Sequence, residues 1–181
     1  FLSEVRNEIP PQTIWTFKEV GHSDSAKKAL ADLFSEPNFA TPKPVQLVRR
    51  VLELSSDKDS IVLDSFAGSG TTGHAVLELN KEDNGKRKFI MVEMEDYANE
   101  ITAERVRRVI KGVPESKNFK EGTGGTFSYF ELGDPIEMEN ILHGENFPSY
   151  ADLARYLFYT ATGEEFDPNQ LNEEENFIGS S

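Results

Sequence analysis

The feature that most constrains this chain is the segment 61–73, which reads as a strand running directly into a glycine turn and then into a helix. Residues 61–63 are an unbroken apolar run, which is typical of a parallel strand buried on both faces. The turn fits the pattern G-x-G-x-x-G, with its glycines at Gly68, Gly70 and Gly73. Such glycines let the backbone turn tightly and approach a ligand, although the same pattern also occurs in turns that are only structural.

Two acidic residues indicate which ligand this turn would hold. Asp64 ends the strand, where the pyrophosphate of NAD or FAD would meet a like charge. S-adenosylmethionine has no phosphate and carries an ammonium, a sulfonium and a ribose diol, so Asp64 favours this methyl donor. Residues 88–93 read as a second strand that ends in Glu93, near the usual place for an acid that binds ribose hydroxyls. Glu93 is therefore the predicted ribose ligand; the alternative is a solvated carboxylate at a strand end.

Several motifs together resemble the cofactor half of amino-group DNA methyltransferases, in the order of the β class. They are Phe39-Ala-Thr-Pro-Lys-Pro44 followed by Leu47, then Asp64-Ser-Phe-Ala-Gly-Ser-Gly-Thr-Thr72, then Phe89-Ile-Met-Val-Glu93. Two further stretches are similar to the modification subunit of type III restriction-modification systems. These are Thr13-Ile-Trp-Thr-Phe-Lys-Glu-Val-Gly-His22 and Leu153-Ala-Arg-Tyr-Leu-Phe-Tyr-Thr-Ala-Thr-Gly163. The resemblance covers about residues 10–163, and it implies methyl transfer from S-adenosylmethionine to the N6 amine of adenine in DNA.

The resemblance also implies a set of cofactor-binding residues. They are Thr41, Lys43, Asp64, Phe66, Ala67, Gly68, Ser69, Gly70, Thr71, Thr72 and Glu93. In the family, the Thr-Pro-Lys-Pro segment lies against the methionine end of the donor, which assigns Thr41 and Lys43, although a plain helix start explains its prolines equally well. Phe66 is either a residue on the ligand side of the turn that packs on the donor or a core residue at a strand end.

The catalytic motif of this family, Asp-Pro-Pro-Tyr, is absent from the chain. The two Asp-Pro pairs, at Asp134 and Asp167, lack both the second proline and the aromatic residue. Amino methylation needs that motif to polarise the exocyclic amine and to stack on a flipped base. No residue is therefore assigned a catalytic role, and we expect an inactive fragment, the C-terminal part of a longer enzyme.

Composition limits the remaining possibilities. A net charge of −13 argues against this segment as the main DNA-binding surface, so DNA contact is expected mostly upstream. Basic runs at 49–50, 86–88 and 105–111 either touch the DNA backbone or form solvated faces. The absence of cysteine removes disulfides and the thiol nucleophile of carbon-5 methylation, and makes a cytoplasmic protein the default. The dispersed histidines, His22, His74 and His143, suggest no metal site.

The predicted fold class is α/β, a partial Rossmann-like S-adenosylmethionine-dependent methyltransferase fold with a mainly parallel sheet and a C-terminal α/β extension. Helices are predicted over 23–34 with Ser23 as cap, 44–54, 71–79 and 97–111, and from a Ser149 cap onward; a third strand is predicted over 126–132. The predicted parts are a connector over 1–38, the cofactor-binding part over 39–135 and an extension with an acidic tail over 136–181. With so few strands, the strand at 61–63 should leave an apolar edge bare, so we expect self-association or covering by the upstream region.

The predicted partners are DNA, the restriction subunit of the same system and a second copy of the subunit; no long apolar stretch suggests a membrane span. Other readings stay open. A cytosine-N4 methyltransferase would share all these motifs, a dinucleotide oxidoreductase would share the glycines but not Asp64, and a noncatalytic assembly module would bind no small molecule. The aromatic residues Trp15, Phe17, Tyr129 and Phe130 form either a base-stacking platform or part of the core.

Overall fold

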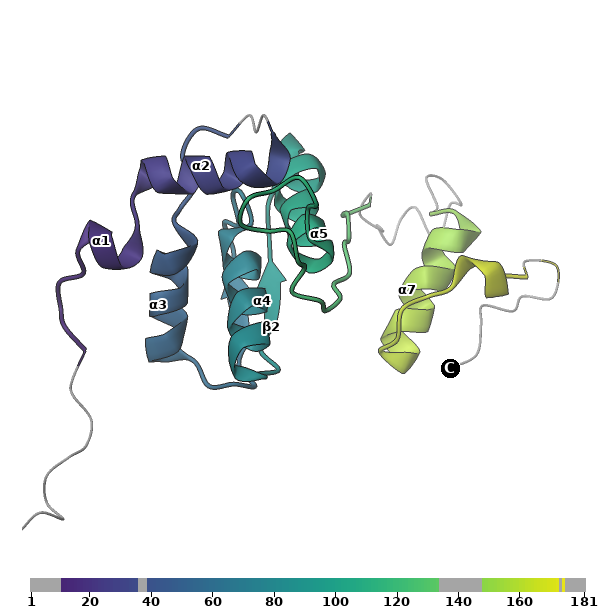
Figure 1. Cartoon of the computed structure of the whole chain (residues 1–181). Coiled ribbons are helices and arrows are strands. Elements are labelled where there is room, and N and C mark those ends of the chain that lie inside the picture. The colour runs from purple at the N-terminus through teal and green to yellow at the C-terminus, as the bar shows by residue number, and fades with distance from the viewer. Residues whose placement is uncertain (1–10, 36–38, 134–147, 173, 175–181) are drawn as a thin grey trace, which may run out of the picture. The chain divides into compact units, whose positions relative to one another are not determined.

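The computed structural model describes residues 11–35, 39–133, 148–172 and 174 of the chain. The chain divides into two compact units, Phe1–Tyr129 and Phe130–Ser181, and each is considered by itself (Figure 1). His143 and the predicted boundary between 135 and 136 lie outside the described residues. The division into three parts stays a prediction.

The first unit alternates helices and strands. Its elements are the helices α1 (Phe17–Val20), α2 (Ser23–Phe34) and α3 (Val45–Ser55), the strand β1 (Ile61–Asp64), the helix α4 (Thr71–Asp83), the strand β2 (Lys88–Met91), the 3-10 turn η2 (Asp96–Ala98), the π-helical turn η3 (Asn99–Ala103) and the helix α5 (Glu104–Lys111). The helices α3, α4 and α5 stand side by side, and α2 crosses their ends (Figure 1). The predicted helices over 23–34, 44–54 and 71–79 are confirmed, the last one longer than expected.

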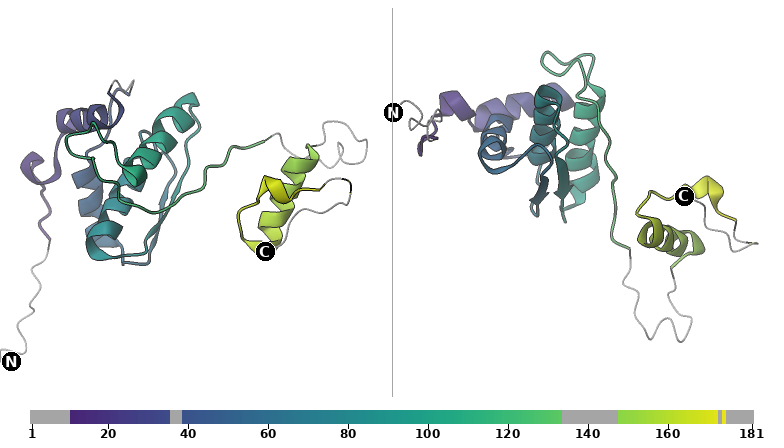
Figure 2. Two further views of the ribbon diagram at one scale, coloured as in Figure 1. Left: turned by 45° about the vertical axis from the view of Figure 1, so that its right-hand side comes forward. Right: turned by 90° about the horizontal axis from the view of Figure 1, so that it is seen from below.

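The two strands form a parallel sheet in which Leu63 is opposite Ile90. One face of the sheet packs on the helices, through Val62 and Phe89, and the helices lie on the same side of the strands in Figure 2. The other face is bare, because Ile61 is 65%, Leu63 66% and Ile90 53% exposed. The prediction of a strand buried on both faces is therefore wrong for the residues that the structure describes.

The core lies between the helices and the covered face of the sheet. One cluster joins α3 to α4, and a second joins α2, α4 and α5. The clusters bury Val45, Leu52, Ala75, Val76 and Leu79 in the first and Leu33, Leu77, Val106 and Val109 in the second. Phe89 contacts both clusters, so this strand residue ties the whole helical layer to the sheet.

Three local predictions are corrected. The cap of α2 is His22, whose Nδ1 accepts from the Ser25 N–H at 3.3 Å, and not Ser23. The predicted helix over 97–111 is α-helical only from Glu104, because the chain first makes the turns η2 and η3. The predicted strand over 126–132 is irregular; Phe127 packs on the second cluster, and the guanidinium of Arg107 lies 5.8 Å from its ring centre.

The second unit contains the helix α7 (Tyr150–Thr162) and the 3-10 turn η4 (Pro168–Gln170). The predicted cap is confirmed, since the Ser149 hydroxyl accepts from the Asp152 N–H at 3.2 Å. A small cluster of Ala154, Phe158 and Phe166 forms its interior. Glu164 and Glu165 are exposed, and most of the predicted acidic tail beyond them lies outside the described residues.

Candidate functional site

The carboxyl ends of the two parallel strands converge on the glycine turn. Asp64 ends β1, and Glu93 follows β2 at the position that shares its sheet face, because side chains alternate along a strand. The pairing continues past the strands: the Val92 N–H donates to the Asp64 carbonyl at 2.8 Å, and the Ala67 N–H donates to the Val92 carbonyl at 3.0 Å. The turn is thus fixed over the end of the sheet, with one carboxylate on each strand beside it.

The three glycines of the turn have different roles. Gly68 and Gly70 have φ of 53° and 75°, left-handed values that side chains rarely adopt. A Cβ at Gly70 would lie 2.8 Å from the Thr102 carbonyl oxygen, and one at Gly73 would lie 2.9 Å from the Met91 methyl carbon. At Gly68 the nearest atom would be in the Phe39 ring, at 3.4 Å. Gly70 and Gly73 therefore allow close packing of η3, β2 and α4, while Gly68 faces the more open side.

Asp64 accepts hydrogen bonds from two residues of the turn. The Phe66 N–H donates to Oδ1 at 3.1 Å, and the Thr72 hydroxyl donates to Oδ2. A carboxylate has about four acceptor positions, so this side chain keeps capacity for a cationic ligand. Phe66 itself is 86% exposed, which rules out the core alternative for this residue.

Glu93 closes the same turn from the second strand. Its Oε2 accepts from the Gly68 N–H at 2.7 Å, and its Oε1 accepts from the N–H groups of Met94 and Glu95, at 2.9 and 3.1 Å. Burial, followed by the charges of Glu93 and Glu95, raises the pKa of the nearby Tyr97 above its ordinary value. Glu93 is thus a built part of the turn and not a free strand-end carboxylate.

The Thr-Pro-Lys-Pro segment lies beside the turn. The Thr71 hydroxyl donates to the Lys43 carbonyl at 3.3 Å. Pro42 and Pro44 are buried, whereas Thr41 and Lys43 are exposed, so the prolines fix the backbone and the polar side chains point outward. The segment is therefore held next to α4 by contacts that a plain helix start does not require.

Two aromatic residues that were not predicted as site residues stand at the open side of the turn. The Phe39 ring approaches Gly68 and packs edge-on against Tyr97, with the ring centres 5.3 Å apart. In the sequence Phe39 is only the first residue of a motif, and nothing in the pattern around Tyr97 distinguishes it from a residue at a helix start. Their position beside Gly68 and Glu93 makes them candidate walls for a flat ring.

Beneath the turn lie Arg105 and Thr102, two residues that sequence reasoning also missed. Ala67, Ser69 and Thr71 are buried, and Arg105 is 1% exposed. The Arg105 guanidinium donates to the Ser69 carbonyl, the Ser69 hydroxyl and the Thr71 hydroxyl, at 3.2, 3.0 and 2.9 Å. The Thr102 hydroxyl donates to the Gly68 carbonyl. Arg105 was assigned to a basic run that either touched DNA or was solvated, and both alternatives are wrong for this residue.

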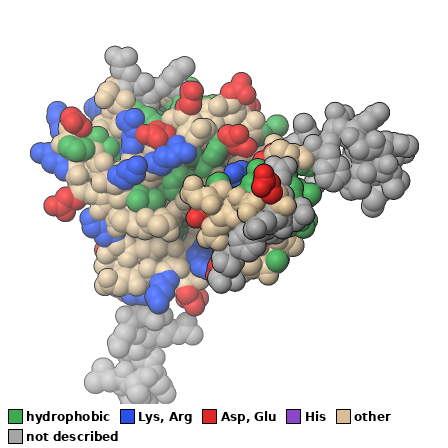
Figure 3. Space-filling view, turned by 90° about the vertical axis from the view of Figure 1, so that its right-hand side faces the viewer, with side chains coloured by type: hydrophobic (Ala, Val, Ile, Leu, Met, Phe, Trp, Pro, Cys, Tyr) green, Lys and Arg blue, Asp and Glu red, His purple; other side chains and the backbone are tan. Residues whose placement is uncertain are grey.

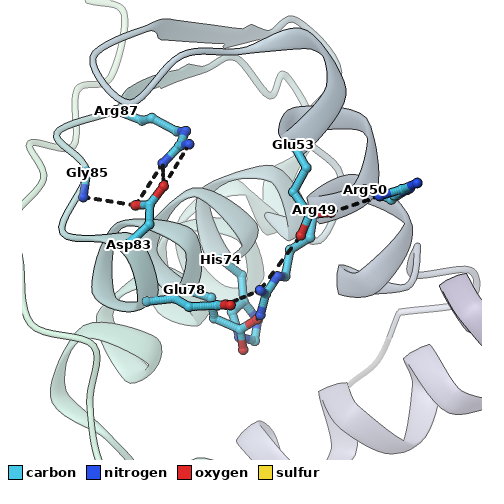
Figure 4. A network of polar contacts seen from close by, with 9 residues as sticks. Arg49, Arg50, Glu53, His74, Glu78, Asp83, Gly85 and Arg87 are labelled. Atoms are coloured by element: carbon cyan, nitrogen blue, oxygen red, sulfur yellow. Dashed lines mark hydrogen bonds and ion pairs between the residues drawn. The ribbon is translucent and has the colours of Figure 1, made fainter. Parts of the chain in front are cut away.

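The arginines of the other basic runs pair with neighbouring acids. Arg49 pairs with Glu78 and Glu82, and Arg87 pairs with Asp83 at 3.0 Å (Figure 4). On the face drawn in Figure 3, Lys and Arg side chains are interspersed with Asp and Glu side chains. These arrangements agree with a chain whose net charge is strongly negative.

A surface groove of about 690 Å³ lies away from the turn, along α1 and α3. Trp15 lines it together with both acids and bases, including Glu19, Arg49, Arg50 and Glu53. Within the described residues, no group of histidines and acids is placed to hold a metal ion. None of the described helices combines the length and the apolar character that a membrane crossing requires.

Comparisons with known proteins bear on the same segments. A family model described as "DNA methylase" matches residues 3–104. The chain is 40% identical to the Type III restriction-modification enzyme StyLTI Mod subunit of Salmonella typhimurium, over 71% of this chain and 21% of that protein. It is 36% identical to the EcoPI Mod subunit of Escherichia phage P1, over 58% and 19%, and 32% identical to the DNA adenine methyltransferase YhdJ of Escherichia coli, over 56% and 33%. The chain thus spans about a fifth of the length of the two Mod subunits.

Proposed function

Because this chain belongs to the DNA methylase family, we propose that it is the S-adenosylmethionine-binding part of a DNA adenine-N6 methyltransferase. The matches confirm the resemblance to Mod subunits that the motifs suggested. The observation that supports a donor site is the pair of carboxylates, Asp64 and Glu93, at the ends of adjacent parallel strands around one glycine turn. Two negative charges there disfavour a pyrophosphate and suit a cation.

The side chains of the turn fit the groups of this donor. Asp64 would bind the methionine ammonium, since its carboxylate keeps free acceptor positions beside the bonds to Phe66 and Thr72. Glu93 would bind the ribose hydroxyls, and Gly68 would let the donor approach the backbone on the side where Phe39 and Tyr97 stand. The bound donor supplies an electrophilic methyl group on sulfur.

The other residues that the motifs assign to the donor would contact it through their backbone or from the border of the site. Ala67, Ser69, Gly70 and Thr71 are buried in the turn, whereas Phe66 is exposed beside it. Thr41 and Lys43 would lie near the methionine end, because their segment is bonded to Thr71. This set agrees with the assignment that the motifs implied, with Phe39 and Tyr97 added.

Chemistry on the acceptor would need residues that this chain does not supply. Asp167 of one Asp-Pro pair accepts from the Asn169 N–H at 3.0 Å and caps the turn η4, so it has a structural role. The other pair, at Asp134, lies outside the described residues. We therefore assign this chain to donor binding and place base flipping and amine polarisation in a separate part of the enzyme.

The partners follow from the same proposal. The relatives with the longest matches are named as Mod subunits of Type III restriction-modification enzymes, so a restriction subunit and DNA are the proposed partners here. Since the chain has a net charge of −13, DNA contact is assigned mainly to the rest of the enzyme.

Calorimetric titration of the chain with S-adenosylmethionine and, separately, with NADH tests the donor site. We expect the first to bind and the second not to bind. Asp64→Ala should weaken donor binding at least ~10-fold, because a charge-assisted contact is lost, with the fold intact by circular dichroism. Asp59→Ala removes the same charge from an exposed position before β1 and serves as the matched control. Unchanged affinity of Asp64→Ala removes that residue from the site, and preferential NADH binding contradicts the proposal.

The acceptor is tested in the complete subunit. After incubation with unmethylated DNA, mass spectrometry of the nucleosides should show N6-methyladenine. If N4-methylcytosine forms instead, the adenine assignment is wrong while the donor site remains.

A further inference from the structure

The glycine turn is supported from inside the domain by one buried cation. Arg105 comes from α5, and its contacts with Ser69 and Thr71 are all between buried side chains or backbone. A buried guanidinium costs free energy unless its donors are used, so a position under the turn needs these acceptors.

The contacts of Arg105 reach both segments of the proposed donor site. Because the Thr71 hydroxyl accepts from Arg105, its own hydrogen is free to donate, and it donates to the Lys43 carbonyl. One side chain therefore fixes the glycine turn directly and the Thr-Pro-Lys-Pro segment through a single intervening hydroxyl. Arg105 itself is not among the residues proposed to touch the donor.

A histidine connects this cation to the surface. The Arg105 Nε–H donates to His74 Nδ1 at 3.3 Å, and His74 Nε2 lies 3.0 Å from Glu78 Oε1. Since an arginine Nε always carries hydrogen, Nδ1 must be the acceptor, and the proton of a neutral His74 must sit on Nε2. Glu78 is bonded in turn to Arg49 on α3 (Figure 4).

The state of each group supports this chain of bonds. Burial lowers the pKa of Arg105 to about 10, with a partial offset from Glu78, so the guanidinium keeps its charge at neutral pH. Burial and the nearby Arg105 lower the pKa of His74, against the opposing effect of its bond to Glu78. A neutral His74 is the form that the Arg105 bond requires.

We propose that Arg105 is the positioning residue of the donor site: held by neutral His74, it fixes Ser69 and Thr71 and so sets how tightly the turn binds S-adenosylmethionine. The inference rests on the proposed function, since it concerns the same turn. It assigns a role in binding to a residue that touches no ligand.

The test compares donor affinity in wild type, Arg105→Met, Arg105→Lys and Val109→Ala. Val109 is buried on the same helix, one turn further on, and packs in the second cluster without contacting the turn. We expect Arg105→Met to bind S-adenosylmethionine at least ~10-fold more weakly, because its polar partners are left unpaired, and Val109→Ala to stay within ~2-fold of wild type. An affinity loss in Arg105→Met no larger than that of Val109→Ala overturns the inference.

The second variant and a second readout keep the test decisive. A lysine keeps the charge but has one ammonium, which cannot serve both Thr71 and His74, so Arg105→Lys should also weaken binding. Should Arg105→Met not fold, wild-type affinity in Arg105→Lys overturns the inference. Nitrogen NMR of His74 should show the proton on Nε2, and a proton on Nδ1 contradicts the link.

The amide NMR signals of Ser69 and Gly70 separate failure of this inference from failure of the proposed function. They should shift in Arg105→Lys and stay in place in Val109→Ala, whether or not donor is present. If wild type binds no S-adenosylmethionine, the donor site proposal fails, whereas unshifted Ser69 and Gly70 signals reject the positioning role of Arg105.

Discussion

The Glu93 carboxylate accepts a hydrogen bond from the Gly68 N–H at 2.7 Å, so the end of the second strand holds the turn that follows the first strand. The same carboxylate accepts from the N–H groups of Met94 and Glu95. An acid of the proposed ribose site is therefore also a structural element of the turn, and changes to it should affect both stability and binding.

Glu93→Gln should destabilise the first unit by about 1–3 kcal/mol, because an amide has one acceptor oxygen and turns its NH₂ toward backbone N–H groups. Urea unfolding measures this loss, and hydrogen exchange at Gly68 should become faster. Glu100→Gln, an exposed acid in η3, is the control and should change neither quantity. Unaltered exchange at Gly68 in Glu93→Gln would show that the carboxylate does not hold the turn.

Gly70→Ala should destabilise the protein by about 3 kcal/mol, because its left-handed backbone and a crowded Cβ position act together. The added Cβ would lie 2.8 Å from the Thr102 carbonyl oxygen. Gly124 has almost the same φ, 73° against 75°, but no atom lies within 4 Å of its Cβ position. Gly124→Ala should therefore cost only about 1 kcal/mol. Equal losses in chemical denaturation of the two variants would contradict the close packing at Gly70.

The free energy of unfolding should fall as the pH drops below the ordinary His pKa of about 6.5. The folded pKa of His74 is lowered mainly by burial, so the unfolded chain binds the proton first and acid favours unfolding. The pKa of Glu78 is also lowered, through its bonds to His74 and Arg49 against the effect of burial, and it adds a loss in the same direction at more acid pH.

His74→Asn keeps an acceptor near the position of Nδ1 and removes the titration. Denaturation curves between about pH 5 and pH 7 should therefore be flatter for this variant than for wild type. His22→Asn is the control: it removes a histidine that caps α2, and asparagine can still serve as a cap. The dependence of its unfolding free energy on pH should stay that of wild type. Parallel slopes for wild type and His74→Asn would exclude His74 as the titrating group.

The bare sheet face should drive self-association of the chain. Four apolar side chains of β1, β2 and the residue after it are more than half exposed, namely Ile61, Leu63, Ile90 and Val92. The double variant Leu63→Gln with Ile90→Gln should sediment as a smaller species than wild type at equal concentration. Val51→Gln with Leu54→Gln changes exposed apolar residues of α3 and is the control. A monodisperse wild-type monomer at all concentrations would remove the basis for this prediction.

The helices α2, α3 and α4 and both strands of the first unit could be predicted from the sequence because each has a local signal. The stripe of Leu30 and Leu33, the prolines before α3 and the glycine pattern all act within one or two turns of chain. The irregular course of residues 126–132 could not be predicted, because an alternating pattern does not say whether a neighbouring strand exists. Phe127 and Tyr129 pack on Arg107 instead.

Only the part of the site that has local sequence signals could be predicted. Asp64, Glu93 and the glycines follow from strand ends and backbone conformation, and the structure brings them together. Arg105 and Thr102 contact the turn over more than thirty residues of sequence, and a basic run on a helix gives no sign of which arginine is buried. Their roles emerge only when the packing of α5 against α4 is known.

The wide π-helical turn Asn99–Ala103 determines how the following helix α5 is rotated about its axis, and so which way Arg105 points. Each helical residue turns the chain by about 100°. Deleting a single residue there would therefore rotate Arg105 toward water and bring the residue next to it under the glycine turn. Natural variants should therefore rarely carry insertions or deletions in this stretch. Its length should indicate an intact donor site better than the identity of any one of its side chains.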